Sequence, residues 1–558
     1  MIRVGLLALL LILPACATAA VGADNPAVTA AELRAHVEWL ADDAREGRRA
    51  GTAAERIAAA YVAQQFARAG LQPAGEAGGW YQEFDVPLPA QPGACSLTVE
   101  GRPVAGVGTL ACSATGTVRA PLASGEVRGA IALLRAGTND AGALRSAIRA
   151  AADQGAVGAV VGIHANDVAA GAPDTPAFDF ARGELALPLV TVASADFTIL
   201  WTRTGAGERP DAALGAAVQR STARSRNVLG LLPGSGPDVL VVGAHFDHLG
   251  WGGEDSLAPG ERAIHNGADD NASGTAVLIE LAEEWGGSEV GVQPPEVGVL
   301  FAAWSAEELG LLGSAHWVKN PTVDLACVRA NVNLDMVGRA AGGRITVGSA
   351  ETASAFRPAL DAVQASLREG GIGLELAVAE GQLPGGGGSD HMSFQQAGIP
   401  ALFFFSGLHA DYHKPSDDAE KLDYALMREV AVAVSELLVQ LQDAEPAALA
   451  FLKPAEPAGG EREARRPGVW FGSIPDYAAA PEGGGMQIAG TSPGSPAEKA
   501  GLQAGDVIRK LGDVAIGDIY DFMDALGQFK TGDTVAVEFV RGGAIRIVPL
   551  TFIPRPGA

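Results

Sequence analysis

The sequence predicts an α/β protein with a mixed, mainly parallel sheet flanked by helices, an inserted β-rich domain and a small C-terminal domain. Between residues 221 and 445, continuous apolar runs alternate with helical segments, which is typical of parallel strands buried on both faces. The chain has 558 residues, a length that suits about three domains of ~100–200 residues. The residue composition and pattern of the sequence also change near residues 86 and 446.

The first 19 residues predict an export signal, because one basic residue precedes a short apolar run and then small residues. The run is too short to span a bilayer as a stable helix. Cleavage after Ala19 would release a periplasmic or extracellular protein. Residues 13–16 also resemble a lipobox, in which the signal would end at Ala15 and Cys16 would carry a lipid anchor to the outer membrane. Both alternatives remain open.

The net charge of −25 argues against nucleic acid as a partner, because phosphate binding requires clustered Lys and Arg. The same charge disfavours electrostatic binding to an anionic membrane. A lipid on Cys16 is therefore the expected membrane contact. Cys95 and Cys112 could form a disulfide in an oxidising compartment.

The N-terminal part of the α/β domain, residues 24–85, begins with two helical patterns. Residues 31–40 follow Thr29, a plausible N-cap, and a second helix begins at Thr52 and ends at Gly70. Residues 45–49 form a polar turn between them.

Residues 86–220 alternate short apolar strands with Gly and Ala and hold no catalytic cluster, which predicts the insert. The α/β pattern continues over residues 221–445. Strands are expected at 239–243, 297–304, 330–336 and 401–405, with helices at 275–285 and 309–319. Residues 446–467 predict a linker and residues 468–556 a small domain.

Five segments place metal-binding side chains just beyond the ends of the predicted strands of the α/β domain, where ligands bind in such sheets. They carry His245 with Asp247, Asp269 with Asp270, Glu307 with Glu308, Asp335, and His413. Adjacent carboxylates repel one another unless cations neutralise them, although acidic residues also cap helices. Two histidines and at least three carboxylates suit zinc, and also admit manganese or cobalt. Two metal ions that share one carboxylate are the economical arrangement.

In this order, the five segments resemble the M28 family of zinc peptidases over about residues 30–445, with the insert similar to a protease-associated domain. The resemblance implies a zinc-peptidase fold and two Zn²⁺ per chain. It implies that His245 and Asp335 bind one ion, Glu308 and His413 bind the other, and Asp269 bridges them. Glu307 would be the general base and acid, Asp247 would orient His245, and Tyr412 would stabilise the oxyanion. His248, His391 and His409 are expected to be non-ligands, with His391 in a segment near the substrate after a run of glycines.

The implied activity is that of a metallo-aminopeptidase, which hydrolyses the N-terminal bond of peptide substrates. Three alternatives remain on related scaffolds. A carboxypeptidase or dipeptidase would need a basic residue for the substrate carboxylate, for which Arg339 is the candidate. A non-catalytic binding protein would be expected to have lost ligands, and a cyclising acyltransferase would use one zinc ion.

The segment from Ser495 to Ile508 resembles the signature of bacterial PDZ domains, and residues 532–535 and 540–543 continue the resemblance. Such domains bind extended peptide ends by strand addition, so a peptide or a protein C-terminus is the expected partner. The expected carboxylate-binding stretch, residues 469–472, departs from the commonest glycine-rich sequence.

Overall fold

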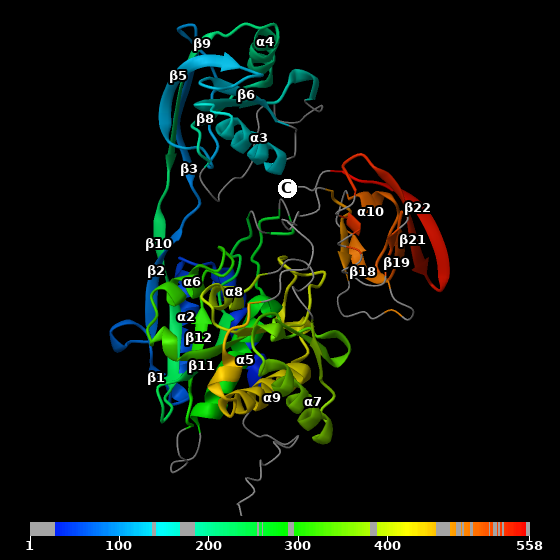
Figure 1. The fold of residues 1–558 in the computed structure, drawn as a ribbon. Helices are drawn as coiled ribbons and strands as arrows, with labels where there is room; N and C mark the ends of the chain where they lie inside the picture. The colour runs from blue at the N-terminus through cyan, green and yellow to red at the C-terminus, as the bar shows by residue number, and fades with distance from the viewer. Residues whose placement is uncertain are drawn as a thin grey trace, which may run out of the picture.

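The computed structural model describes most of the chain in three bodies (Figure 1). The described residues are 28–136, 141–167, 185–253, 256–258, 261–287, 295–379, 388–453, 469–475, 481, 485–491, 495–512, 514–516, 522, 525–526 and 529–553. The expected export signal and Cys16 lie outside them, as do most of the expected linker and most of the glycine run before Ser389. Among the described helices, none combines the length and the apolar character needed to cross a membrane.

The largest body is built on a nine-stranded sheet in the order β1-β10-β12-β11-β13-β16-β14-β15, with β2 also paired to β10. Its strands are β1 (Gln72–Pro73), β2 (Tyr81–Pro87), β10 (Thr222–Leu232), β11 (Val239–His245), β12 (Gly298–Trp304), β13 (Val328–Leu334), β14 (Arg344–Gly348), β15 (Glu375–Val378) and β16 (Ala401–Phe405). The four central strands, β12, β11, β13 and β16, are parallel, whereas β10 and β14 pair with them antiparallel. The sheet is therefore mixed with a parallel centre, as expected.

Helices cover both faces of this sheet. The helices are α1 (Ala30–Leu40), α2 (Ala53–Arg68), α5 (Gly274–Gly286), α6 (Leu312–Lys319), α7 (Phe356–Glu369), α8 (His391–Gln396) and α9 (Tyr424–Gln442). On β11, Leu240 and Val242 pack in one apolar core with α1, α2, α5, α7 and α9. Val241 faces the opposite core, which holds Trp317 of α6 and Phe394 of α8. Successive side chains of a strand point to opposite faces, so continuous apolar runs serve two cores.

The insert is a separate body with a seven-stranded sheet in the order β4-β3-β9-β5-β6-β7-β8. Its elements are β3 (Gln91–Val99), β4 (Arg102–Pro103), β5 (Gly116–Ala123), β6 (Ile131–Arg135), α3 (Ala141–Asp153), β7 (Gly158–Gly162), β8 (Leu189–Thr191), α4 (Ser194–Gly205) and β9 (Asp211–Gln219). The four strands β5 to β8 are parallel. The described part of the β-rich insert thus also contains the helices α3 and α4. The sequence predictions for this segment did not include them.

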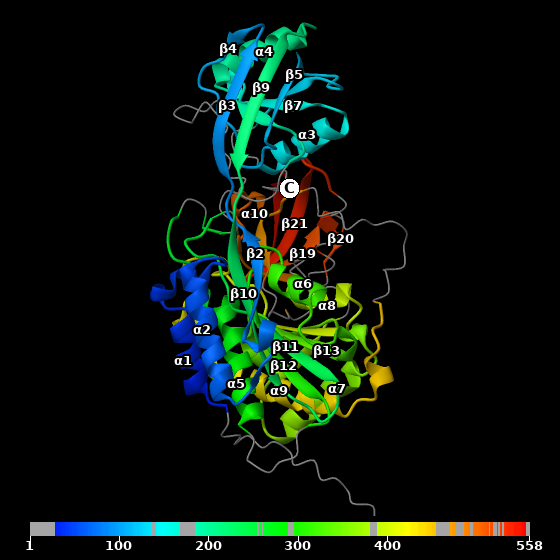
Figure 2. The ribbon, with the colours of Figure 1, turned by 90° about the vertical axis from the view of Figure 1, so that its left-hand side faces the viewer.

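The chain enters and leaves the insert through neighbouring strands. β2 pairs with β10 in the large sheet, and β3 pairs with β9 in the insert. Figure 2 shows the two pairs following one another as a continuous ribbon. Within the insert, no disulfide joins Cys95 and Cys112; the Cys95 thiol donates to the carbonyl oxygen of Val107 at 3.1 Å.

The C-terminal body has a six-stranded sheet with its own apolar core, which includes Ile488, Phe539 and Phe552. Its elements are β17 (Ser473–Pro475), β18 (Met486–Thr491), α10 (Pro496–Lys499), β19 (Val507–Leu511), β20 (Val514–Ala515), β21 (Thr534–Arg541) and β22 (Ala544–Thr551). Ser495 caps α10 by accepting a hydrogen bond from the amide of Glu498 at 3.1 Å. The signature segment thus forms a short helix followed by a strand.

Candidate metal centre

Four adjacent parallel strands end at the same edge of the large sheet, and polar side chains follow each of them. β11 ends at His245, Glu307 and Glu308 follow β12, and Asp335 follows β13 directly. The segment after β16 carries His413. The loop between β11 and α5 adds Asp269 and Asp270, from one irregular helical turn (Ala268–Ser273). Parallel pairing therefore brings residues from five distant segments to one edge.

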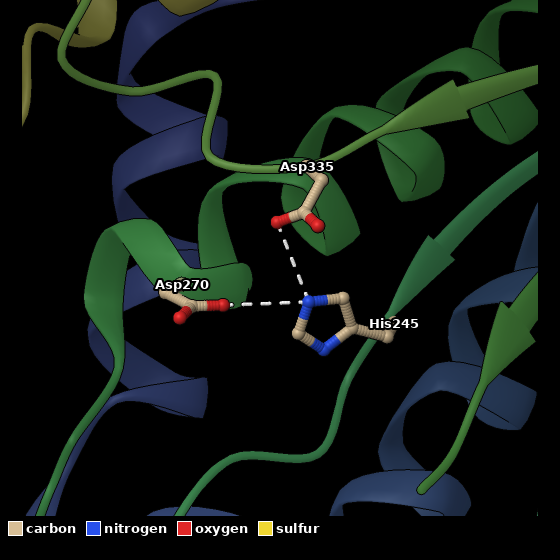
Figure 3. A group of neighbouring side chains, drawn as sticks. All are labelled: His245, Asp270 and Asp335. Carbon is tan, nitrogen blue, oxygen red and sulfur yellow. Dashed lines mark ion pairs between the residues drawn. The ribbon is translucent and has the colours of Figure 1, made fainter. Parts of the chain in front are cut away.

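One group of donor atoms surrounds the Nε2 atom of His245 (Figure 3). Asp270 Oδ1 and Asp335 Oδ1 each lie 3.3 Å from this nitrogen. All three residues are buried, with exposed fractions of 8% or less. The three donor atoms converge on one point at the strand ends.

A second group of donor atoms shares Asp270 with the first. His413 Nε2 lies 3.2 Å from Asp270 Oδ2 and 3.3 Å from Glu308 Oε2. His248 Nδ1 contacts the other oxygen of Glu308 at 2.8 Å and lies 3.9 Å from Asp270 Oδ2. His248 is therefore part of the cluster, although the sequence predicted no role for it as a ligand; its spacing of three residues from His245 was the available signal.

The bridging position expected of Asp269 is taken by Asp270. The two oxygens of Asp270 face His245 and His413, on opposite sides of the carboxylate. Asp269 turns away: its Oδ1 accepts a hydrogen bond from the amide of Gly338 at 2.7 Å, and its Oδ2 lies 3.2 Å from His409 Nε2. Adjacent side chains in this irregular turn diverge, and no local sequence pattern distinguishes the two aspartates.

His245 is oriented by Asp247, but through the main chain. His245 Nδ1 lies 3.2 Å from the carbonyl oxygen of Asp247, which can only accept a hydrogen bond. This contact requires a hydrogen on Nδ1 and leaves Nε2 available as a ligand. The Asp247 carboxylate is 3.7 Å from Nδ1, and it accepts a hydrogen bond from the amide of Glu307 at 3.1 Å. Asp247 thus ties the segments that carry His245 and Glu307.

Glu307 and Glu308 are neighbours with opposite electrostatics. Burial raises the pKa of Glu307 well above its usual range, and the nearby carboxylates of Glu308 and Asp335 raise it further, whereas His245 opposes them. Burial also acts on Glu308, but His413 and His248 outweigh it and lower its pKa to about 2. Two adjacent carboxyl groups with separated pKa values are typical of one acid–base group beside one permanently ionised group.

Tyr412 stacks on the ring of His413, with centroids 3.9 Å apart. Burial and the carboxylates of Asp270 and Glu308 raise the pKa of its phenol well above the usual value. The phenol therefore keeps its proton and can act as a hydrogen-bond donor. His391, in contrast, stacks on Phe403 at 4.4 Å, and burial lowers its pKa to about 3.

The donor set fits zinc. Around a tetrahedral zinc ion with ligand bonds near 2.0–2.1 Å, ligand atoms lie about 3.3 Å apart. Four contacts in the cluster, those of His245 and His413 with their carboxylates, measure 3.2–3.3 Å. Charge-assisted hydrogen bonds are usually shorter, near 2.7–2.9 Å. The spacing and the nitrogen–oxygen chemistry of the donors both match metal ligands.

Arg48 lies behind the cluster and is completely buried, whereas the sequence placed it in a polar turn. Its guanidinium donates hydrogen bonds of 2.7–3.0 Å to the carbonyl oxygens of Leu40, Phe246, Asn266 and Gly267. Two of the segments it joins are those that bear His245 and Asp270. No local pattern could have revealed this role, because all four acceptors are main-chain atoms.

Two family models match parts of the chain. Residues 227–438 match the model of peptidase family M28. Residues 437–550 match the model of the PDZ domain. The M28 and PDZ parts of the sequence resemblance are thus confirmed, while the protease-associated character of the insert stays a prediction.

Curated relatives match over part of the chain. Leupeptin-inactivating enzyme 1 from Streptomyces exfoliatus is 32% identical over 203 residues, which are 36% of this chain and 40% of the relative. Aminopeptidase YwaD from Bacillus subtilis (strain 168) is 31% identical over 212 residues, which are 36% of this chain and 40% of the relative. The chain therefore spans about two fifths of the length of these relatives. Among solved structures, an aminopeptidase from Aneurinibacillus sp. strain AM-1 is 22% identical over 77% of this chain and 96% of its own, with a TM-score of 0.48.

Proposed function

We propose that the protein is a two-zinc aminopeptidase that hydrolyses the N-terminal bond of peptides. The observation that carries this proposal is the position of Asp270, whose two carboxylate oxygens face the imidazoles of His245 and His413. Two donor groups that share a carboxylate suit a pair of metal ions, an arrangement common in aminopeptidases. In the proposed site, His245 and Asp335 hold one ion, His413 and Glu308 hold the other, and Asp270 holds both.

Zinc in this site would supply Lewis-acid activation of the scissile carbonyl and of a water molecule. The chain's own residues move the protons. Glu307, with its Oε2 atom 4.0 Å from His245 Nε2, lies beside the donor set and takes the proton of the attacking water. It then returns the proton to the leaving amine. Tyr412 donates a hydrogen bond to the oxyanion, and Asp247 fixes the main chain of Glu307.

The choice of exopeptidase rests on what surrounds the cluster. A carboxypeptidase would need a free cation for the substrate carboxylate, and the candidate Arg339 is already bound to Asp411 at 2.6 Å and to His409 at 3.1 Å. The carboxylates at the site favour a free substrate amine instead. The name of the relative YwaD supports the same activity.

Chromogenic aminoacyl amides test the proposal. Metal-stripped protein should not cleave these substrates, and added zinc should restore cleavage. Glu307→Gln should lower kcat by about 10³-fold or more while it still binds zinc, because only the proton transfer is lost. Substrates with an acetylated amine should resist cleavage. Cleavage of peptides with a blocked amine and a free C-terminal carboxyl group would instead establish a carboxypeptidase, and zinc binding without any cleavage would indicate a binding protein.

Two wider roles are also part of the proposal. The first is export to the periplasm or the cell exterior, on the basis of residues 1–19. Fractionation of cells, with a Cys16→Ala control, would separate a lipid-anchored form from a soluble one.

The second is capture of peptide C-termini by the PDZ segment. A panel of labelled C-terminal peptides titrated with the full chain measures that binding.

A further inference from the structure

The segment between β16 and the turn Ala419–Lys421 carries two residues of the site, Tyr412 and His413, without any regular secondary structure of its own. His413 has a φ of 54°, in the left-handed region. For a residue other than glycine this conformation is strained, so the surrounding contacts must impose it. The segment therefore needs an external brace to present the His413 imidazole to Asp270 and Glu308.

Asp411 provides the contacts of such a brace. Its Oδ2 accepts a hydrogen bond from Arg339 Nη1 at 2.6 Å. Its Oδ1 accepts hydrogen bonds from Ser416 Oγ at 2.7 Å and from Lys421 Nζ at 2.8 Å. The carboxylate is mostly buried, with 18% of its side chain exposed, and one immediate neighbour in sequence is Tyr412. The hydrogen bonds from Ser416 and Lys421 connect Asp411 to later residues of the same part of the chain. The hydrogen bond from Arg339 connects the segment to a different part of the chain.

Arg339 comes from a different ligand-bearing segment, four residues beyond Asp335. The same Nη1 atom lies 3.1 Å from His409 Nδ1. Because Arg339 can only donate, Nδ1 must accept and the imidazole carries its hydrogen on Nε2, which lies 3.2 Å from Asp269 Oδ2. Arg339 thus links the segments that carry Asp335, His413 and Asp270.

We propose that the Arg339–Asp411 pair is a positioning device for the second metal subsite, the one formed by His413 and Glu308. This inference rests on the proposed two-zinc function. Arg339 and Asp411 do not contact the side chains of His413 or Glu308. The pair acts through the conformation of the segment that bears His413. Its loss should therefore weaken one subsite, whereas the subsite of His245 and Asp335, which is built on the ends of β11 and β13, should keep its affinity.

Zinc titration of the metal-stripped full chain tests this. The parent should bind two ions. Asp411→Asn should keep one affinity within about threefold and weaken the other by about 10–100-fold, the range typical when a partner that orients a ligand is lost. His413→Ala identifies the weakened subsite. Arg339→Gln should have the same selective effect. In the double variant, the affinity of the second subsite for zinc should be no lower than in the more affected single variant, because both changes break the same contact between Arg339 and Asp411.

Controls separate this role from a general effect on folding. Arg344→Gln removes an exposed ion pair with Glu375 in the same body and should leave both affinities unchanged. Ser416→Ala removes one hydrogen bond to Asp411 and should weaken the same subsite by a smaller factor, which keeps the test valid if Asp411→Asn folds poorly. Equal weakening of both subsites, no weakening, or additive effects of the two variants would each overturn the proposal. A parent that binds fewer than two zinc ions would instead overturn the proposed function.

Discussion

Asp269 and Asp270 have the same side chain and different surroundings. Both are fully or almost fully buried, and both follow Ala268 in one irregular turn. Asp270 faces two imidazoles, whereas Asp269 accepts the amide hydrogen of Gly338 and lies against His409. An isosteric change at each position therefore separates the role of a bridging carboxylate from the effect of a buried charge in the same turn.

Asp270→Asn should weaken zinc binding by at least about 100-fold and lower kcat/KM by about 10³-fold or more. An amide offers one oxygen where two are required, so at least one ion loses a ligand. Asp269→Asn keeps the oxygen that binds Gly338 and should change zinc affinity by less than about tenfold. Competition with a chromophoric chelator measures both affinities. The assignment of the bridge would be wrong if Asp269→Asn were the more damaging variant.

The ligand-bearing segments were predictable, whereas the direction of individual side chains was not. His245, Glu308, Asp335 and His413 follow apolar strands, and parallel strands bring such residues together at one edge. Whether Asp269 or Asp270 points inward depends on the dihedral angles of one turn. Arg48 was missed for a related reason, because its partners are carbonyl oxygens that belong to every residue type.

At the level of elements, α2 begins with a buried charge that its sequence does not reveal. Thr52 caps the helix by accepting a hydrogen bond from the amide of Glu55. Glutamate in this position often turns back to the cap residue. Here Glu55 is fully buried and its Oε1 accepts hydrogen bonds from Ser225 and Ser305 at 3.1 and 3.2 Å, whereas its Oε2 has no partner. The carboxyl group thus joins α2 to β10 and to the end of β12.

Glu55 should make stability depend on pH. Burial raises its pKa from 4.5 to about 7, and the two serines oppose this only in part. Because the folded pKa is above the unfolded one, the contribution of Glu55 to stability is complete below pH 4.5 and is lost as the pH rises through 7. The loss amounts to about 3 kcal/mol.

Glu55→Gln should therefore be more stable than the parent at pH 8, by up to about 3 kcal/mol, and similar to it at pH 4. Urea unfolding of metal-stripped protein at both pH values, followed by the fluorescence of the buried Trp304 and Trp317, measures this difference. The exposed Glu351→Gln is the matched control and should show no such dependence. An equal effect of Glu55→Gln at both pH values would contradict the assignment.

Strands and helices of the large sheet were also predictable because each pattern has one physical cause. Runs such as β11 and β12 are apolar on both faces, and helices α1 and α2 begin at threonine caps. In the insert, α3 and α4 are rich in small or polar residues and follow short strands, and the sequence predictions did not include them. The parallel order β5-β6-β7-β8 depends on contacts between residues far apart in sequence, which no local pattern encodes.

For the whole molecule, the arrangement of the insert suggests that the large body folds without it. The insert has separate apolar cores, which share no member with the two cores around the large sheet. Its two connections are adjacent, because Pro87 pairs with Thr222 and the amide of Leu88 donates to the carbonyl oxygen of Ser221 at 2.9 Å. Chain ends this close can be joined by a tight turn.

Removal of residues 89–220, with Asn-Gly joining Leu88 to Ser221, should give a folded and active protein. The new two-residue turn closes β2 and β10 as a hairpin, and its favoured backbone twist matches that of antiparallel strands. Zinc affinity and kcat/KM on small aminoacyl amides should stay within about tenfold of the parent values. A longer deletion, 86–223 with the same turn, also removes Val86, which is fully buried against Phe84 and Ala50, and should be clearly less stable. If the shorter deletion also fails to fold or to bind zinc, the insert is part of the structure that supports the metal centre and not an independent unit.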